Sequence, residues 1–241
     1  MHGSVVNADL TWSAQKPLAE QFEIGAPNRR GFPPGPDVER VDFEDEAVWL
    51  ERFLEPGTHL VGHSYGGVIS LLVAARRPEL IRSLTVVEPP AFGVARGEPA
   101  VEDFVQGIEE HWTNGPRDPD DFLRGFLALV GSSTPPGNFT PDLLQGARTL
   151  MVERNPAEAV IPLEELAAAP FPKLAVSGGH SRAFEAVCDV LAERLGAERA
   201  VLPGMGHSVQ RLGEPLNARL REFVLRAEAQ SAGKPDATSS A

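Results

Sequence analysis

Residues 60–68 read Leu60-Val61-Gly62-His63-Ser64-Tyr65-Gly66-Gly67-Val68, and this stretch decides the fold. Two apolar residues lead into the pattern Gly-x-Ser-x-Gly, and an apolar run to Ala75 follows it directly. This order predicts a strand, a sharp turn with Ser64 at its apex, and a helix. Gly62 and Gly66 carry no Cβ, so neighbouring segments can approach the strained turn closely. The N–H groups that begin the helix would point at the serine, where they can stabilise an oxyanion.

This turn resembles the nucleophile elbow of the α/β-hydrolase superfamily, in its Gly-His-Ser-x-Gly-Gly form at Gly62–Gly67. A chance match in a loop is the alternative, but the flanking strand-like and helix-like runs favour the elbow. The resemblance covers roughly residues 1–229. It implies an α/β fold with a mostly parallel, doubly wound sheet and a helical lid inserted after the sixth strand. It also implies a serine, an acid and a histidine as catalytic residues, in that chain order.

Length and charge limit the partners. The chain has 241 residues, 42% of them hydrophobic, which suits one α/β domain with a sizeable core. Its formal charge of −12 argues against nucleic acid as a partner. Residues 92–165 hold thirteen Asp and Glu against five Arg, or −8, so we expect a substrate that is not strongly anionic. A small-molecule substrate is the expected partner, and the oligomeric state is left open.

Cys188 is the one cysteine, so no internal disulfide can form and a reducing, cytoplasmic location is expected. It falls on the apolar side of a predicted helix, which favours a buried and inert thiol. No apolar stretch is long enough to span a membrane, and there is no signal peptide, so we expect no membrane association.

The chain opens on His2-Gly3-Ser4. In the α/β-hydrolase pattern a His-Gly pair follows the third strand, and the next residue donates an oxyanion-hole N–H. That strand and the family's first hairpin have no counterpart before His2. Because the missing strand belongs between the fourth and fifth, its neighbours would keep unpaired backbone groups. We therefore expect that N-terminal strands are missing from this sequence. Alternatively, the His-Gly pair is coincidental and the first strand lies elsewhere.

The remaining segments follow the resemblance in order. Pro27-Asn28-Arg29-Arg30-Gly31 is similar to a family loop that has Asp where Asn28 stands. Asp42 is typical of a helix N-cap, with acidic residues in the turn that follows. The predicted fourth to eighth strands are Phe22–Ala26, Thr58–Gly62, Ser83–Val87, Lys173–Ser177 and Arg199–Leu202. Helical patterns cover Ala14–Phe22, Phe184–Leu195 and a last helix that presents Leu216, Leu220, Phe223 and Val224.

These segments predict one domain in four parts. Residues 1–91 form the N-terminal part of the core, and residues 166–229 form its C-terminal part. Residues 92–165 form the helical lid, with helical pieces at Val101–Trp112, Asp121–Val130 and Pro141–Arg154 separated by Pro/Gly clusters. Residues 230–241 are too polar to bury apolar surface, so a disordered tail is predicted.

The catalytic base must be a histidine, because a serine hydroxyl is a poor nucleophile without one. Of the six histidines, His207 follows the last predicted strand in a Gly-Met-Gly-His loop whose glycines allow close approach. His59 falls at the wrong end of the fifth strand, and His63 is expected to point away from Ser64. His207 is therefore the predicted base, as the resemblance also implies.

The acid departs from the usual family pattern. The stretch Gly178–Arg182, after the seventh strand, contains no carboxylate, and Glu185 and Asp189 fall inside the next helix. One subgroup of haloalkane dehalogenases, in the same superfamily, carries a glutamate directly after the sixth strand, and Glu88 has that position here. Pro89-Pro90 would hold it rigidly at the carboxyl end of the sheet. The alternative is a solvated glutamate at a strand end. The serine nucleophile excludes dehalogenation by the aspartate mechanism of those enzymes.

The backbone N–H groups of Ser4 and Tyr65 are the predicted oxyanion hole. Apolar lid residues suggest a pocket over Ser64, although some of them must form the lid's own core. The candidate pocket residues are Trp112, Phe122, Phe126, Phe139 and Met151. No histidine and carboxylate cluster has metal-ligand spacing along the chain, and there is no dinucleotide fingerprint, so no metal or cofactor is expected.

These features predict a serine hydrolase that cleaves a carboxylic ester or related acyl bond through an acyl-enzyme. The expected substrate is small to medium and largely apolar. The same scaffold also supports carbon–carbon bond hydrolases, cofactor-free perhydrolases and slow-turnover or non-enzymatic small-molecule receptors. Fast turnover of p-nitrophenyl esters would favour an enzyme, and ligand-dependent partner binding would favour a receptor.

Overall fold

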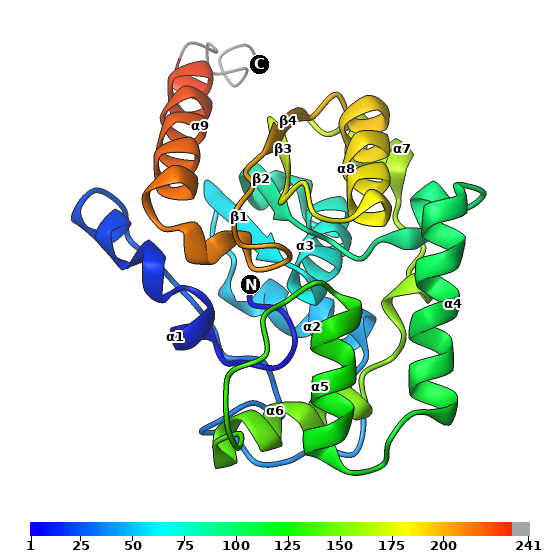
Figure 1. The fold of residues 1–241 in the computed structure, drawn as a ribbon. Helices are drawn as coiled ribbons and strands as arrows, with labels where there is room; N and C mark the ends of the chain where they lie inside the picture. The colour runs from blue at the N-terminus through cyan, green and yellow to red at the C-terminus, as the bar shows by residue number, and fades with distance from the viewer. Residues whose placement is uncertain (233–241) are drawn as a thin grey trace.

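A four-stranded parallel sheet lies at the centre of the computed structural model, which describes residues 1–232 (Figure 1). Its order is β1 (Thr58–His63), β2 (Ile81–Val87), β3 (Lys173–Ser177) and β4 (Glu198–Val201). His63 pairs with Val87, and Val87 pairs with Val176. The carboxyl ends of adjacent strands therefore lie at the same height along one end of the sheet. The residues that directly follow β1 and β2, Ser64 and Glu88, begin side by side at this end.

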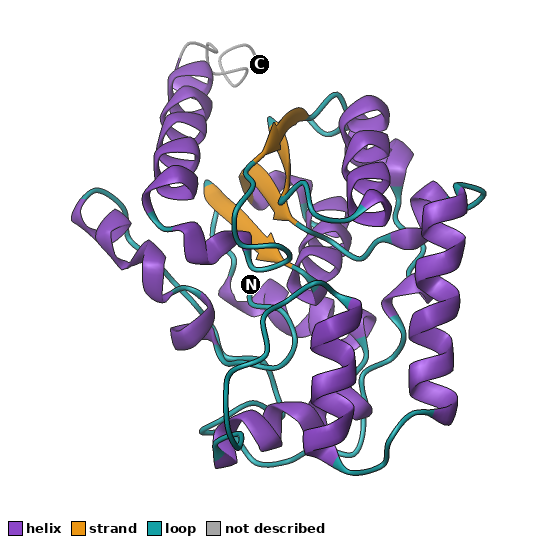
Figure 2. Cartoon of the chain, viewed as in Figure 1, coloured by secondary structure: helices purple, strands orange, loops and turns teal. Residues whose placement is uncertain are grey.

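Helices cover both faces of the sheet, as a doubly wound fold requires (Figure 2). On one face Leu84, Val86 and Ala175 pack with α2 (Phe43–Leu50), α3 (Tyr65–Arg76), α7 (Leu163–Ala168) and α8 (Arg182–Leu195). On the other face Val87 and Val176 pack with α9 (Glu214–Ala232) and the 3-10 helix η1 (Ser13–Glu20). The alternation follows from the two-residue period of a strand, and it makes the strands apolar on both sides.

Helix α3 is buried from Tyr65 to Ala74, because it runs from the serine turn directly beneath the sheet. A helix that is apolar all round is stable only when surrounded in this way. Asp42 caps α2 by accepting a hydrogen bond from the Glu44 N–H at 2.9 Å, as predicted. Cys188 is buried in α8, and burial raises the pKa of its thiol, which agrees with the predicted inert residue.

Residues 92–165 form three longer helices, α4 (Pro99–Asn114), α5 (Pro119–Leu129) and α6 (Pro141–Met151), close to the predicted segments. They lie beyond the carboxyl ends of the strands, on the side away from α9 (Figure 1). Each begins with proline, and the side chains of Asp118 and Thr140 cap α5 and α6. The remaining short helices are α1 (Ala8–Thr11), η2 (Glu51–Phe53), η3 (Pro78–Leu80), η4 (Phe92–Ala95), η5 (Pro156–Glu158) and η6 (Val209–Leu212).

The predicted strand Phe22–Ala26 was wrong, because these residues pair with no strand. In the family's order this strand pairs with the one before the His-Gly turn, and residues 1–232 contain no strand there. At that edge of β1, Met1 takes part instead: its carbonyl accepts the His63 N–H at 3.0 Å. An extended segment without a neighbour has no ladder to join.

Two smaller expectations also changed. The helical pattern at Ala14–Phe22 forms as a 3-10 helix with Pro17 inside it, because proline cannot donate the hydrogen bond that an α-helix needs. Residues 230–232, predicted as tail, continue α9, where Gln and Ala sustain a helix. The rest of the predicted tail lies outside the described residues. Within residues 1–232 no helix is long and apolar enough to cross a membrane.

Candidate active site

Ser64 occupies the strained turn that the sequence predicted. Its backbone has φ 52° and ψ −129°, a conformation that costs a non-glycine residue free energy. The neighbouring glycines are required by space: a Cβ on Gly62 would lie 2.4 Å from Ser70 Oγ, and one on Gly66 would lie 2.3 Å from the His2 carbonyl oxygen. The Ser64 N–H donates to the Val87 carbonyl at 2.9 Å, which ties the turn to β2.

Ser64, His207 and Glu88 form a continuous chain of buried contacts. His207 Nε2 lies 2.9 Å from Ser64 Oγ, and His207 Nδ1 lies 3.1 Å from Glu88 Oε2. Ser64 directly follows β1, Glu88 directly follows β2, and His207 lies in the loop after β4. The three residues meet because the carboxyl ends of these strands lie at the same height in the sheet. Glu88 also has a positive φ of 51°, and the backbone N–H of Gly178 donates to its other carboxylate oxygen.

Burial and neighbouring groups set the protonation states of Glu88 and His207. Burial raises the pKa of Glu88 to about 7, and the Gly178 N–H opposes the shift. Burial lowers the pKa of His207 to about 3, with nearby His180 acting in the same direction. His207 is therefore neutral. With Nδ1–H donating to Glu88, its Nε2 keeps a lone pair toward the Ser64 hydroxyl, which is the arrangement of a general base.

The alternative acids lie elsewhere. Glu185 Oε2 and Asp189 Oδ1 bind the Arg199 guanidinium at 2.5 and 2.8 Å. The other oxygen of Glu185 accepts the Gly179 N–H at 3.0 Å. Neither carboxylate contacts His207, so the geometry favours Glu88 over both.

His63 supports the histidine loop, a position that the sequence did not indicate. Its Nε2–H donates to the His207 carbonyl at 3.0 Å, so the ring faces the backbone of His207. Burial lowers the pKa of His63 to about 3, which keeps the ring neutral. His59, by contrast, contacts Ser83 and Glu228 at the opposite end of β1, as expected.

The predicted oxyanion-hole residues flank the serine. A Cβ on Gly3 would lie 2.8 Å from Ser64 Cβ, so the chain passes close to the serine just before Ser4. Tyr65 is the first residue of α3, where backbone N–H groups have no partner in their own helix. Within residues 1–232 neither the Ser4 nor the Tyr65 N–H donates a hydrogen bond. Both amides are thus available beside Ser64.

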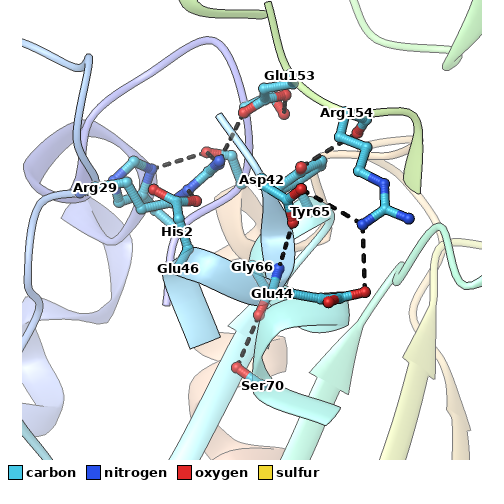
Figure 3. A network of polar contacts seen from close by, with 12 residues as sticks. His2, Arg29, Asp42, Glu44, Glu46, Tyr65, Gly66, Ser70, Glu153 and Arg154 are labelled. Carbon is cyan, nitrogen blue, oxygen red and sulfur yellow. Dashed lines mark hydrogen bonds and ion pairs between the residues drawn. The ribbon is translucent and has the colours of Figure 1, made fainter. Parts of the chain in front are cut away.

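A buried ion network contacts the turn that carries Gly3 and Ser4, and Figure 3 labels its residues Arg29, Glu46 and Glu153. Arg29 donates to the Gly3 carbonyl at 3.0 Å, and it pairs with Glu46 at 2.6 Å and Glu153 at 2.7 Å. The Ser4 hydroxyl donates to the other oxygen of Glu153. Although burial opposes its charge, the two carboxylates raise the pKa of Arg29. The network therefore connects α2, the end of the 92–165 segment and the turn that carries Ser4.

His2 completes this network. The Arg29 backbone N–H donates to His2 Nε2 at 2.9 Å, so the ring's proton lies on Nδ1, which donates to the Gly3 carbonyl at 2.8 Å. Burial lowers the pKa of His2, in keeping with this neutral form. The sequence marked the loop around Arg29 by resemblance, but the acidic partners of Arg29 are too distant in the chain for a pattern to reveal.

Two adjoining pockets reach Ser64 and His207, with about 430 and 690 Å³ of open space. Trp112 and Phe126 line the first, and Phe126 and Phe139 line the second, as predicted. Phe122 and Met151 line neither, which corrects the prediction. Phe122 packs edge-on against Trp112 in the small core between α4, α5 and α6, and Met151 packs against the same cluster. A helical pattern shows which residues are apolar but not which neighbour they face.

Further apolar residues that were not predicted from the sequence also line the first pocket. Ile108 and Phe104 lie one and two turns before Trp112 on α4, so their spacing of four could have identified them. Phe92 and Phe184 come from separate segments, and their place depends on the tertiary fold. The pocket is therefore almost entirely apolar apart from Ser4, Ser64, Tyr65, Glu153 and His207.

One group of side chains brings metal-ligating atoms together. Glu88, His180 and His207 each offer a donor atom, and the three atoms lie within 4.8 Å of one another. The sequence predicted no metal ligands, because these residues are separated by 92 and 27 positions and show no ligand spacing. The cluster forms because Glu88, His180 and His207 all follow strands whose carboxyl ends are aligned in the sheet.

Residues 1–218 match the model of the Alpha/beta hydrolase family. A 67-residue stretch is 36% identical to the probable lysophospholipase BODYGUARD 3 of Arabidopsis thaliana, covering 28% of this chain and 13% of that protein. An 88-residue stretch is 31% identical to the AB hydrolase superfamily protein YfhM of Bacillus subtilis strain 168, covering 33% and 31%. The chain thus matches less than a third of the length of either curated relative.

A solved structure has a similar fold. A thermophilic esterase from Thermogutta terrifontis is 19% identical, with a TM-score of 0.63 over 94% of this chain and 88% of that one. At this identity the likeness shows the fold. Together with the family match over most of its length, it establishes that the chain belongs to the α/β-hydrolase family.

Proposed function

We propose that the protein is a serine hydrolase that cleaves a carboxylic ester or a related acyl bond through an acyl-enzyme. The chain of contacts from Ser64 through His207 to Glu88 is the observation that carries this proposal. Membership of the α/β-hydrolase family supports hydrolysis, and the structural likeness to an esterase is consistent with an ester as substrate.

In this proposal His207 Nε2 takes the Ser64 proton as Oγ attacks the substrate carbonyl. Glu88 accepts the Nδ1–H and stabilises the imidazolium that forms. The backbone N–H groups of Ser4 and Tyr65 donate to the oxyanion, and each is worth roughly 3 kcal/mol of barrier. His207 then protonates the leaving alcohol. In the second half of the reaction His207 takes a proton from a water molecule, the water attacks the acyl-enzyme, and the proton returns to Ser64 Oγ as the acid is released.

The proposed substrate is a neutral ester with an apolar acyl group. The first pocket surrounds the reacting atoms with Phe92, Phe104, Trp112 and Phe184, and such walls favour an apolar group of modest size. Helices α4 and α5 supply part of these walls, so residues 92–165 would act as the lid that selects the substrate.

A fluorophosphonate probe tests the nucleophile directly, because it reacts with an activated serine and needs no natural substrate. The probe should label the protein at Ser64, and Ser64→Ala should abolish labelling. Ser70→Ala is the matched control, since Ser70 lies on α3, the helix that follows Ser64, with its hydroxyl bound to the Gly66 carbonyl. Labelling that survives Ser64→Ala would overturn the assignment.

A further inference from the structure

His180 lies beside Glu88 and His207, and the proposed hydrolase mechanism gives it no part. Its Nε2 lies 3.1 Å from the Val130 carbonyl oxygen, and a carbonyl only accepts, so Nε2 carries the ring's proton. In the neutral ring Nδ1 therefore holds a lone pair. Among the described residues this buried nitrogen has no hydrogen-bond partner, and it lies 3.7 Å from Glu88 Oε2. Such an unpaired buried acceptor costs free energy unless something binds it.

The spacing around this nitrogen is close to that of a metal site. His180 Nδ1 and His207 Nδ1 lie 3.7 and 3.1 Å from Glu88 Oε2, and all three atoms fit within 4.8 Å. Ligands bound tetrahedrally to zinc at about 2.0–2.1 Å are separated by about 3.3 Å. Two histidine nitrogens and one carboxylate are also a ligand set that zinc commonly takes, with water in the fourth position.

The surroundings of the two rings suit metal binding. Metal-bound histidines generally donate their other N–H to an oxygen atom, and His180 does so to Val130. His207 has Ser64 Oγ in the corresponding position. The His180 side chain is 16% exposed while that of Glu88 is fully buried, so solvent reaches the group from the His180 side.

We propose that Glu88, His180 and His207 form an inhibitory zinc site on the Nδ1 side of His207, which faces away from Ser64. Zinc on His207 Nδ1 replaces the hydrogen bond to Glu88, and the ring's one proton moves to Nε2. Nε2–H then faces Ser64 Oγ and cannot accept the serine proton. Bound zinc therefore prevents His207 from acting as a base, although the metal lies outside the substrate pocket. A chelator that removes the zinc restores this base.

Binding is measured by calorimetric titration of ZnCl₂ into Ser64→Ala, so that this arm is independent of the proposed function. We expect one zinc ion per chain. His180→Phe, combined with Ser64→Ala, should weaken the affinity by about 100-fold, because it removes a ligand and keeps a ring against Phe184. His59→Gln is the matched control and should leave the affinity unchanged, since His59 lies at the opposite end of β1.

Inhibition is measured with wild-type protein on p-nitrophenyl butyrate, and this arm rests on the proposed function. Zinc at saturating concentration should lower kcat at least tenfold, and EDTA should restore it. His180→Phe, compared with its own metal-free rate, should keep its activity at that concentration. His180→Gln serves if the phenylalanine variant fails to fold.

Absence of zinc binding to Ser64→Ala, or equal affinity in the His180 variants, would overturn the site. Tight binding that leaves turnover unchanged would overturn the inhibitory role. If wild-type protein hydrolyses no ester, the proposed function fails while the calorimetric arm still decides the metal site.

Discussion

Ser64 and Glu88 share a feature that neither residue type prefers, a backbone with φ near +50°. Each directly follows a strand, and these two strands are neighbours in register. The Ser64 N–H binds the β2 carbonyl of Val87, and the Glu88 N–H binds the β3 carbonyl of Val176 at 2.8 Å. The sheet therefore holds both strained turns in place and points both side chains at His207. Strain of this kind concentrates at functional sites.

Replacing Glu88 by glutamine tests its role as the acid. The amide keeps the size of the side chain but cannot stabilise the imidazolium, so kcat should fall about 10⁴-fold, as the corresponding change does in serine proteases. Circular dichroism should show an unchanged fold. Asp189→Asn is the matched control, because Asp189 binds Arg199 and not His207. A loss in Asp189→Asn as large as in Glu88→Gln would contradict the assignment.

The pKa of Glu88 predicts the pH dependence of turnover. Burial raises it to about 7, so the carboxylate that supports His207 becomes protonated as the pH falls through 7. The value of kcat/KM should reach its plateau above that pH, and below it kcat/KM should fall about tenfold per pH unit. His207, with a pKa lowered to about 3, does not limit this range. Glu88→Gln should lose this acidic limb, and a limb that persists in the variant would assign it to another group.

At the scale of elements, four of the five predicted strands form and the fifth, Phe22–Ala26, does not. β3 forms at Lys173–Ser177 as predicted, and β1, β2 and β4 begin or end within two residues of their predictions. These segments are apolar runs bounded by turn residues, so local pattern suffices. Phe22–Ala26 has the same local character, but whether it forms a strand depends on a neighbour at the sheet edge.

The candidate site divides in the same way. Ser64, His207 and Glu88 could be selected because strand order fixes where their segments end. His63, His180 and the partners of Arg29 could not, since their contacts join segments that only the tertiary fold brings together. Phe122 was misplaced for a related reason: it is apolar and on the expected helix, but it faces Trp112 and not the pocket.

At the same scale, the Arg29 network holds the turn that carries Gly3 and Ser4. Arg29→Met would leave the buried carboxylates of Glu46 and Glu153 without their cation, and breaking such a pair costs about 3–5 kcal/mol. Urea unfolding followed by tryptophan fluorescence should show this loss. Arg30→Met, at the exposed neighbouring position, should change stability by less than about 0.5 kcal/mol. Equal unfolding midpoints for the two variants would rule out a structural role for the network.

At the scale of the whole molecule, charge and the apolar pocket should both act on the substrate choice of the proposed hydrolase. The chain carries a formal charge of −12, and residues 92–165, which supply pocket walls, contribute −8 of it. We therefore expect an anionic substrate to be repelled before it reaches Ser64, and it would also have to lose its hydration in an apolar pocket. The first effect acts over long distances and is screened by salt, whereas the second is not.

Paired esters separate the two effects. The proposed hydrolase should act on neutral p-nitrophenyl butyrate with kcat/KM at least about tenfold higher than on the p-nitrophenyl monoester of succinic acid at low ionic strength. Raising the salt from about 0.01 to 1 M shortens the screening length from about 30 to 3 Å, so the gap should narrow. The neutral ester, whose approach is not steered, should show little salt dependence and serves as the control. A gap that does not change with salt would place the discrimination in the pocket alone, and a faster reaction of the anionic ester would contradict the proposed substrate class.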